Sequence, residues 1–325
     1  MSLLVIGEAL IDVIEAGGEV TERPGGSPAN VAIGVSRLGI PARLLTSFGD
    51  DARGEALIDW LGADHVFVER APAERTASAT ALIGADGSAR YTFDIAWDLA
   101  GAAVDVSRVS HVHTGSIGAL LEPGATSVLE LVRRARGVGA GTEPDAGADV
   151  SPESAGVAGA TVSYDPNIRP ALIEDMVAVR GRVRELIALA DVVKCSDEDL
   201  AYLFDTDVPD ETAVIAYAHE FAATGPALVA VTRGSQGVIA VNRAGDIVRV
   251  PAPDVDVVDT VGAGDSFMAA LIYQLDRRGL TGAKNRAALN TLGAAELAEI
   301  CEFAARAAAI TCSREGANPP SIDEL

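Results

Sequence analysis

The chain has 325 residues, of which 49% are hydrophobic, so it can bury a sizeable core as one large domain or two ordinary ones. Its net charge is −22 at pH 7, and its basic residues form no stripe or cluster. This balance argues against nucleic acids and anionic membranes as partners.

The first segment runs from a short apolar stretch into polar residues. Residues 3–6 predict a strand that ends at Gly7 and Glu8, and no basic leader precedes it. Asp12 follows, and its carboxylate can accept hydrogen bonds from two neighbouring hydroxyls, as a polyol would require. The alternative is a plain turn residue. The missing leader and three widely spaced cysteines predict a cytoplasmic protein without disulfides.

A glycine turn then opens a helix at residues 25–30, Gly-Gly-Ser-Pro-Ala-Asn. Ser27 is a predicted N-cap, and Pro28 suits the first turn. Helix capping alone leaves Gly25, Gly26 and Asn30 unexplained. Close approach of the backbone to a sugar, with Asn30 bonding a hydroxyl, explains all three.

Residues 75–94 alternate between apolar and polar side chains around Asp86 and Gly87, which predicts a hairpin. Further on, residues 137–159 are rich in Gly, Ala, Pro, Asp and Glu and lack any apolar period. They predict a disordered insertion, and an inert loop is favoured over a functional one. The histidines show no metal-ligand spacing, so His111 and His113 are expected in the core or at an edge.

Several short apolar runs end in a polar or glycine cluster, with helical stretches between most of them. These runs are residues 3–6, 109–112, 161–164, 191–193 and 228–231. The alternation predicts an α/β fold with a doubly wound, mostly parallel sheet and helices on both faces. Ligands of such folds bind beyond the carboxyl ends of the strands, where Asp165, Lys194 and Thr232 lie.

The most informative motif is residues 259–266, Asp-Thr-Val-Gly-Ala-Gly-Asp-Ser, which opens into an apolar helical run. Gly262 and Gly264 allow successive N–H groups to point at one spot, and the helix dipole adds positive charge there, so the turn suits an anion. Asp265 would repel a merely bound phosphate, but it suits a base beside a moving phosphoryl group. The pattern favours a phosphotransferase. The alternative is a glycine turn whose Asp265 only favours the helix N-terminus.

Residues 25–30 and 259–266 resemble the two signature regions of the ribokinase-like (PfkB) family of carbohydrate kinases. Further matching segments lie at residues 7–12, 49–54, 165–169, 194–200, 232–234 and 313–317. The resemblance covers nearly the whole chain and implies a single ribokinase-like domain over residues 1–325. It also implies a small β-sheet lid over the sugar, with strands within residues 13–23 and 75–95, and such a lid often serves as a dimer clasp.

The resemblance implies an ATP-dependent kinase that uses Mg²⁺, with sugar and ATP as its small-molecule partners. Asp265 would be the general base, and the backbone of Gly262, Ala263 and Gly264 would form the anion hole. The implied sugar contacts are Asp12, Gly25, Gly26, Asn30, Arg169 and Asp265. The implied nucleotide contacts are Lys194, Thr232, Gly234, Gly237, Gly262 and Gly264.

The resemblance also suggests metal ligands. Asp165, Ser196 and Asp199 match the magnesium neighbourhood, although the family has Asn-x-x-Glu where this chain has Ser196 and Asp199, and Glu198 competes for the role. Asp259 and Ser313 match a segment that holds a monovalent cation such as K⁺ in many relatives. A structural salt bridge is the alternative role for Arg169.

Fructose is the preferred sugar because residues 7–12 and 193–198 look more like the family's fructokinases than its ribokinases. Kinases of 2-keto-3-deoxygluconate or ribose are the alternatives, and Tyr91, Phe93 and Trp97 are expected to shape specificity. A sugar or nucleotide sensor on the same fold is the non-enzyme alternative, but a sensor has no need of a base at position 265. The chain lacks G-x-x-x-x-G-K-[ST] and a G-x-G-x-x-G after the first strand, which argues against a P-loop kinase and a dinucleotide-binding enzyme.

Overall fold

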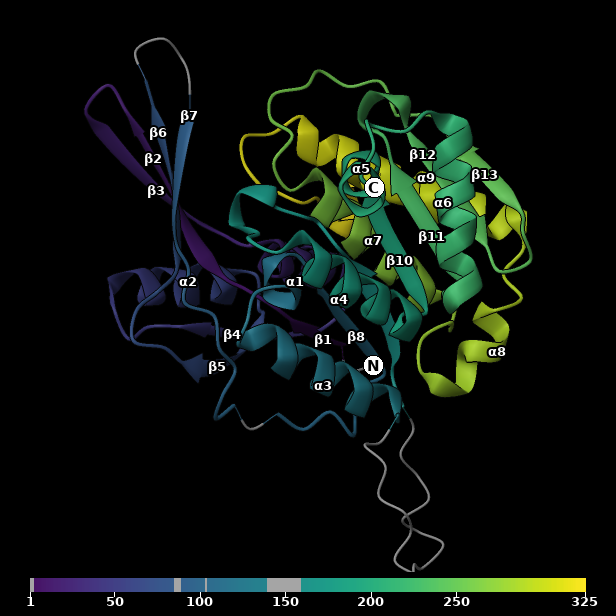
Figure 1. Cartoon of the computed structure of the whole chain (residues 1–325), viewed down its shortest axis with the longest axis horizontal. Helices are drawn as coiled ribbons and strands as arrows, with labels where there is room; N and C mark the ends of the chain where they lie inside the picture. Colours follow the sequence, from purple (N-terminus) through teal and green to yellow (C-terminus); the bar gives the residue numbers. More distant parts are fainter. Residues whose placement is uncertain (1–2, 85–88, 103, 139–158) are drawn as a thin grey trace, which may run out of the picture.

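A large, mostly parallel sheet organises the chain. The computed structural model describes residues 3–84, 89–102, 104–138 and 159–325. In that part of the chain, nine strands form one sheet in the order β13-β12-β11-β10-β9-β8-β1-β4-β5 (Figure 1). They are β1 (Leu3–Ile6), β4 (Ala42–Phe48), β5 (Phe67–Pro72), β8 (His111–Gly115), β9 (Thr161–Asp165), β10 (Val192–Ser196), β11 (Leu228–Thr232), β12 (Val238–Asn242) and β13 (Ile247–Val250). Neighbours from β5 to β11 pair parallel, whereas β12 pairs antiparallel with β11 and with β13.

The central strands β1, β8 and β9 are buried along their whole length because both of their faces are covered. All four residues of β1 are 0% exposed. Parallel strands with helices on each side show this continuous pattern instead of the alternation of a half-exposed strand. The apolar runs therefore predicted strands, and the polar residues after them mark the edge where the strands end.

Helices cover both faces of this sheet. One apolar cluster packs α1 (Ser27–Arg37), α2 (Ala52–Ala63), α7 (Ala263–Arg277), α8 (Arg286–Leu289) and α9 (Ala294–Cys312) against the first face. A second cluster packs α3 (Gly124–Arg136), α4 (Met176–Leu189), α5 (Asp197–Phe204) and α6 (Glu211–Thr224) against the other. The predicted fold class, a doubly wound α/β sheet with helices on both faces, is confirmed.

A smaller sheet projects from one end of the molecule (Figure 1). Its order is β3-β2-β6-β7, formed by β2 (Leu10–Ala16), β3 (Glu19–Gly25), β6 (Ser78–Ile83) and β7 (Ala89–Asp94). Strand β2 continues from β1 after three residues, so Asp12 lies at the base of this sheet, close to the central one. That the small sheet acts as a lid over a sugar stays a prediction.

The predicted insertion falls almost entirely outside the described residues, at 139–158. Its two ends are described, and they meet. Gly137 ends α3 in the left-handed region, and the Ala160 N–H donates to the Ala135 carbonyl oxygen at 2.7 Å. Residues 138 and 159 therefore leave and re-enter the core at one place.

Candidate active site

The first turn of α7 lies against a buried ammonium group. Gly262 has φ +75°, and a Cβ atom added there would lie 2.5 Å from the Ala317 Cβ, so only glycine fits. A Cβ on Gly264 would lie 2.7 Å from Lys194 Nζ. The backbone N–H groups of a first helical turn lack partners within the helix. This turn and Lys194 together make an electropositive spot of the kind that binds phosphate.

Asp265 lies in that first turn and is 7% exposed. Its two oxygens accept hydrogen bonds from the start of α1, namely from Ser27 Oγ at 2.6 Å and from Asn30 Nδ2 at 2.8 Å. The expectation that Ser27 caps α1 was wrong. Gly26 is the N-cap, with φ 113°, so Ser27 is already helical and its hydroxyl is free to orient Asp265.

The two oxygens of Asp265 are both hydrogen bonded, whereas, within the described part of the chain, the amide oxygen of Asn30 is not. Asn30 Oδ1 is buried and has no hydrogen-bond partner among the described residues. Buried polar atoms are nearly always paired in native proteins, so an orphan of this kind marks a place for a ligand donor or water. The amide nitrogen holds Asp265 and the amide oxygen remains for a hydroxyl.

A second carboxyl, that of Glu8, is buried close by. It is 3% exposed, and its Oε2 accepts the Gly118 N–H at 2.8 Å. Burial raises the pKa of Glu8 to about 7, and the negative charge of Asp265 adds to that rise, whereas hydrogen bonds from Ser116 and Gly118 lower the pKa. From the sequence, Glu8 is expected only to follow the first strand and to belong to the family-like segment of residues 7–12. Its position directly after the first buried strand was the available signal.

Asp165, the last residue of β9, and Lys194, in the middle of β10, form a buried ion pair. Lys194 Nζ lies 2.8 Å from Asp165 Oδ2, and the two residues are 4% and 1% exposed. Burial raises the pKa of Asp165 to about 6 against the lowering effect of Lys194. The second oxygen, Asp165 Oδ1, is buried without a partner in the described chain. It is therefore the acceptor that fits a divalent cation here.

The other two expected magnesium ligands are engaged with each other. Asp199 accepts from the backbone N–H and the hydroxyl of Ser196, both at 2.8 Å, and from the Ile168 N–H at 2.7 Å. These bonds form the capping box of α5 and tie it to the end of β9. As placed, Ser196 and Asp199 support the loop around Asp165, and their role as metal ligands stays a prediction.

Asp12 and the two glycines expected to contact sugar lie together. A Cβ on Gly25 would lie 2.3 Å from Asp12 Oδ2, and one on Gly26 would lie 2.6 Å from the Glu8 carbonyl oxygen. The surrounding protein keeps water away from the Asp12 carboxyl and so raises its pKa. The nearby positive charge of Arg169 lowers that pKa in part. Arg169 is exposed and donates only to the carbonyls of residues 167 and 168, with no carboxylate partner in the described chain. The salt-bridge alternative for Arg169 therefore finds no support in the structure.

Asp259 organises the segment that follows α9. Its oxygens accept the N–H groups of Val261 at 3.0 Å and Gly316 at 2.9 Å, and these bonds lower the pKa of Asp259. The Ser313 hydroxyl instead donates to the Ile310 carbonyl at the end of α9. Asp259 thus links the glycine turn before α7 to the chain around Ala317, which packs on Gly262.

A model of the pfkB family carbohydrate kinases matches residues 1–139 and 153–324. The chain belongs to this family. It is 32% identical to a fructokinase of Klebsiella pneumoniae over 85% of each chain, and 30% identical to a fructokinase of Escherichia coli over 96% of this chain and 94% of that one. A solved fructokinase of Xylella fastidiosa with bound ATP is 26% identical, with a TM-score of 0.79, and the match covers 99% and 96% of the two chains. A sugar kinase of Pyrococcus horikoshii in complex with ATP matches with a TM-score of 0.72 and 26% identity over 99% and 96%.

In this PfkB kinase, the turn after β11 lies on the same sheet edge as Asp165. Gly234 and Gly237 have φ of 52° and 83°, and a Cβ on Gly237 would lie 2.1 Å from the Val250 carbonyl oxygen, so the turn needs glycine. Thr232 ends β11 and its hydroxyl donates to the Cys195 carbonyl oxygen at 3.4 Å. Contact of this turn with a nucleotide stays a prediction.

The aromatic residues expected to shape specificity separate into two kinds. Tyr91 is 59% exposed and stacks on Phe93, with ring centroids 6.3 Å apart, on the small sheet. Trp97 is 5% exposed, and its indole N–H donates to the Gly118 carbonyl oxygen at 2.8 Å. Trp97 is therefore a buried side chain that holds the turn at Gly118, and a role of the three aromatic residues in sugar specificity stays a prediction.

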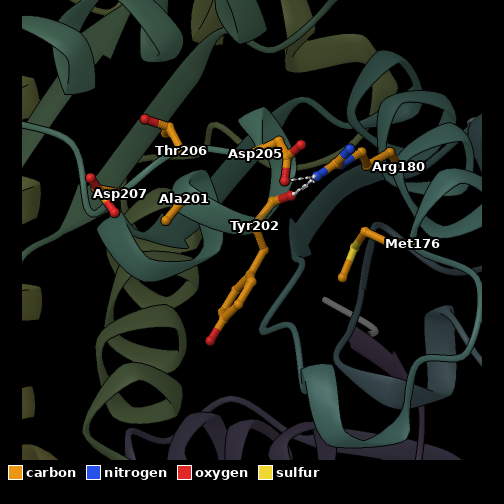
Figure 2. Close-up of a pocket in the computed structure, with 7 residues that line it drawn as sticks. All are labelled: Met176, Arg180, Ala201, Tyr202, Asp205, Thr206 and Asp207. Carbon is orange, nitrogen blue, oxygen red and sulfur yellow. Dashed lines mark hydrogen bonds and ion pairs between the residues drawn. The ribbon is translucent and has the colours of Figure 1, made fainter.

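A separate surface pocket of about 590 Å³ lies between α4 and α5. Figure 2 shows its lining, in which Arg180 reaches across to Asp205 and to the carbonyl of Tyr202. The remaining lining residues are Met176, Ala201, Thr206 and Asp207. None of the expected site residues lies in it, and its one cation is paired within the chain.

The described residues contain neither a ready-made metal site nor a membrane-spanning helix. No cluster of three or more His, Cys, Asp or Glu side chains there could hold a metal. No helix in that part of the kinase is long and apolar enough to cross a membrane.

Proposed function

We propose that this kinase transfers the γ-phosphoryl group of ATP to fructose, forming fructose 6-phosphate, with Asp265 as the general base. The observation that carries the proposal is the carboxylate itself. Asp265 is buried in the first turn of α7 and aligned by Ser27 and Asn30, beside the ammonium of Lys194. The fructokinases among its relatives support fructose as the acceptor.

The chemistry follows from this arrangement. Asp265 would take the proton of the attacking hydroxyl, and the N–H groups of residues 262–265 would stabilise charge on the transferring phosphoryl group. Lys194 adds a positive charge next to Gly264. Phosphoryl transfer needs little covalent help from the protein, so positioning and charge stabilisation account for most of the catalysis.

Cations complete the neutralisation of phosphate in so acidic a protein. We place Mg²⁺ at the unpartnered Oδ1 of Asp165, with Ser196 and Asp199 around it. When bound, Mg²⁺ neutralises charge on the phosphates. For K⁺ we propose Asp259 together with residues 313–317, where Gly316 donates to Asp259 and Ala317 packs on Gly262.

The proposed sugar and nucleotide sites lie on either side of Asp265. Sugar hydroxyls would reach Asp12, Asn30 Oδ1 and Arg169, with Gly25 and Gly26 allowing close approach. The nucleotide phosphates would lie along Lys194 and the turn of Thr232, Gly234 and Gly237.

We also propose a homodimer through the small sheet, in a reducing cytoplasm. Ile14, Ala81 and Tyr91 lie in register across three strands of that sheet, and Ile14 and Tyr91 are 39% and 59% exposed. This apolar row shares its face with Asp12, since residues two apart on a strand point the same way. In a symmetric dimer, the same face of a second copy of this chain would cover the apolar row. The three cysteines are unpaired in the structure, as a reducing compartment requires.

The test is an assay that couples ADP release to a detectable reaction. Fructose, ribose, 2-keto-3-deoxygluconate, adenosine and tagatose are each supplied with ATP and Mg²⁺, in K⁺ and again in tetramethylammonium buffer. Fructose should give the highest kcat/KM, and K⁺ should raise it. Preference for another sugar would replace fructose, equal rates in both buffers would remove the K⁺ site, and no release with any sugar would favour the sensor.

A further inference from the structure

Glu8 is a junction between segments that carry different parts of the site. The turn before α1 lies on its backbone, because a Cβ on Gly26 would lie 2.6 Å from the Glu8 carbonyl oxygen. The turn after β8 lies on its side chain, because a Cβ on Gly118 would lie 2.7 Å from Glu8 Oε2. The first turn orients Asp265 through Ser27. The second leads to Asp165.

The link to Asp165 runs through Ser116. The side chain of Ser116 hydrogen bonds Glu8, and its backbone N–H donates to the Asp165 carbonyl oxygen at 2.9 Å. Ser116 has φ 55° and ψ −157°, a conformation that residues other than glycine rarely adopt. Such conformations persist only where the surroundings enforce them, and they cluster at functional sites.

Gly118 extends the same link on its other side. Its N–H donates to Glu8, and its carbonyl accepts the indole N–H of Trp97, each at 2.8 Å. The peptide before Gly118 and the one after it are therefore both fixed by buried side chains. Trp97 lies just past the end of β7, so the small sheet is joined to the same junction.

We propose that Glu8 is a positioning residue, whose carboxyl holds the turn of residues 116–118 so that Asp165 and Asp265 keep their relative placement during phosphoryl transfer. It touches neither substrate in this role. The kcat measurement below rests on the proposed function. The hydrogen bonds between Glu8 and the turn of residues 116–118 do not depend on it.

The environment of Glu8 favours a role based on shape over one based on charge. Asp265 is the ionisable group whose charge acts on Glu8, and burial and that charge together raise the pKa of Glu8 to about 7. Near neutral pH a large share of the protein therefore holds an uncharged carboxyl here. A side chain of equal length that accepts from Gly118 without a charge should serve as well.

Three substitutions separate length from charge. Glu8→Gln keeps the length and the acceptor, and its kcat should stay within about threefold of wild type. Glu8→Asp keeps the charge but withdraws the oxygen from Gly118, and Glu8→Ala removes it. For both we expect kcat to fall about 10²-fold, the scale of a misplacement near 1 Å, with the KM for ATP nearly unchanged.

Asp191→Asn is the matched control. Asp191 is 5% exposed and accepts the Val162 N–H at 2.8 Å, but it lies at the opposite ends of the strands. Its loss should lower the melting temperature and leave kcat within about threefold of wild type. If Glu8→Ala does not fold, the contrast between the Gln and Asp variants decides alone.

Hydrogen exchange gives a readout that needs no substrate. Peptides covering residues 115–121 should exchange faster in Glu8→Asp and Glu8→Ala, and at the wild-type rate in Glu8→Gln and Asp191→Asn. Unchanged exchange in Glu8→Ala would overturn the proposal, as would a kcat of Glu8→Asp equal to wild type or a kcat of Glu8→Gln as low as that of Glu8→Ala. If wild type phosphorylates no sugar, only the proposed function fails, and the exchange arm still tests the junction.

Discussion

Asp265 depends on two side chains from the other end of the chain. Ser27 lies 238 positions before it and Asn30 lies 235 before it, yet each supplies a donor to one carboxylate oxygen. A carboxylate with both oxygens fixed presents its remaining lone pairs in one direction. A general base needs this restriction, because proton transfer requires hydrogen-bond reach in a defined geometry.

Replacing Asp265 by Asn tests the base without disturbing this frame. The Asn oxygen can accept from Asn30 Nδ2, and its amide can donate to Ser27 Oγ, so the fold should persist. We expect kcat to fall roughly 10²–10⁴-fold with little change in ATP affinity, measured by steady-state kinetics and calorimetry.

Asp276→Asn is the control for that substitution, because Asp276 lies at the far end of the same helix, where its side chain accepts the Thr281 hydroxyl at 3.1 Å. Its kcat should match wild type. An Asp265→Asn enzyme with more than about a tenth of wild-type kcat would refute the assignment of the base.

At the scale of elements, β8 and β9 carry a buried polar row. His111 bonds the hydroxyls of Thr161 at 2.9 Å and Ser163 at 2.8 Å, and His113 bonds Ser163 at 2.9 Å. Burial lowers the pKa of both histidines to about 3, with the positive charge of Lys194 contributing at His113. The expectation of core histidines agrees with their exposures of 0% and 1%.

This row should make the fold sensitive to acid. The histidine pKa values are lower in the folded state than the 6.5 of the unfolded chain, so the unfolded state binds more protons below that pH. The stabilisation is complete above pH 6.5 and is lost as the pH falls toward 3, by about 2 kcal/mol for each histidine at pH 5.

Denaturant unfolding of wild type and a His111→Gln/His113→Asn variant between pH 5 and about 8 measures this linkage. The free-energy difference between the two should shrink as the pH falls. His65→Asn, at an exposed left-handed position, should show a constant difference. A constant difference for the core variant would contradict the linkage.

The insertion between α3 and β9 offers a second test at this scale. Its described ends meet at Ala135 and Ala160, so a short connection can replace residues 139–158. Loop-closure free energy changes only by roughly 0.6 kcal/mol for each doubling of length. Replacement by a few glycines should leave melting temperature and kcat/KM close to wild type. A tenfold rise in sugar KM would instead show that the insertion contributes to the sugar site. A changed oligomeric state in sedimentation would show that it contributes to a subunit interface.

For the whole molecule, the proposed dimer through the small sheet can be tested directly. We expect sedimentation equilibrium to show a dimer, and Tyr91→Asp to yield a monomer because it charges the apolar row. Val20 is the control, since it is 63% exposed but pairs with Glu15, which points to the opposite face from Ile14. Val20→Asp should remain a dimer. A monomeric wild type would end the dimer proposal.

The sequence predicted the sheet because its strands are buried on both faces and end at polar residues. It also predicted Asp265 as a candidate base, because a carboxylate in a glycine turn is unusual at an anion site. It did not reveal that Ser27 orients Asp265, that Asp199 accepts the Ile168 N–H, or that Trp97 points inward. Each of these depends on a contact between segments far apart or on a side-chain direction, and a local pattern carries neither.

The strand order of this kinase also follows the order of synthesis over much of the sheet. From β8 onward each new strand is added at the growing edge of the sheet in the order of synthesis, out to β13. Helix α7 is made after all of them, and it then packs back on α1 and against α9. The last-made helices therefore complete a site that the first-made helix began. A chain that ends before α7 has no Asp265 to align, so we expect catalytic competence to appear only once synthesis is nearly complete.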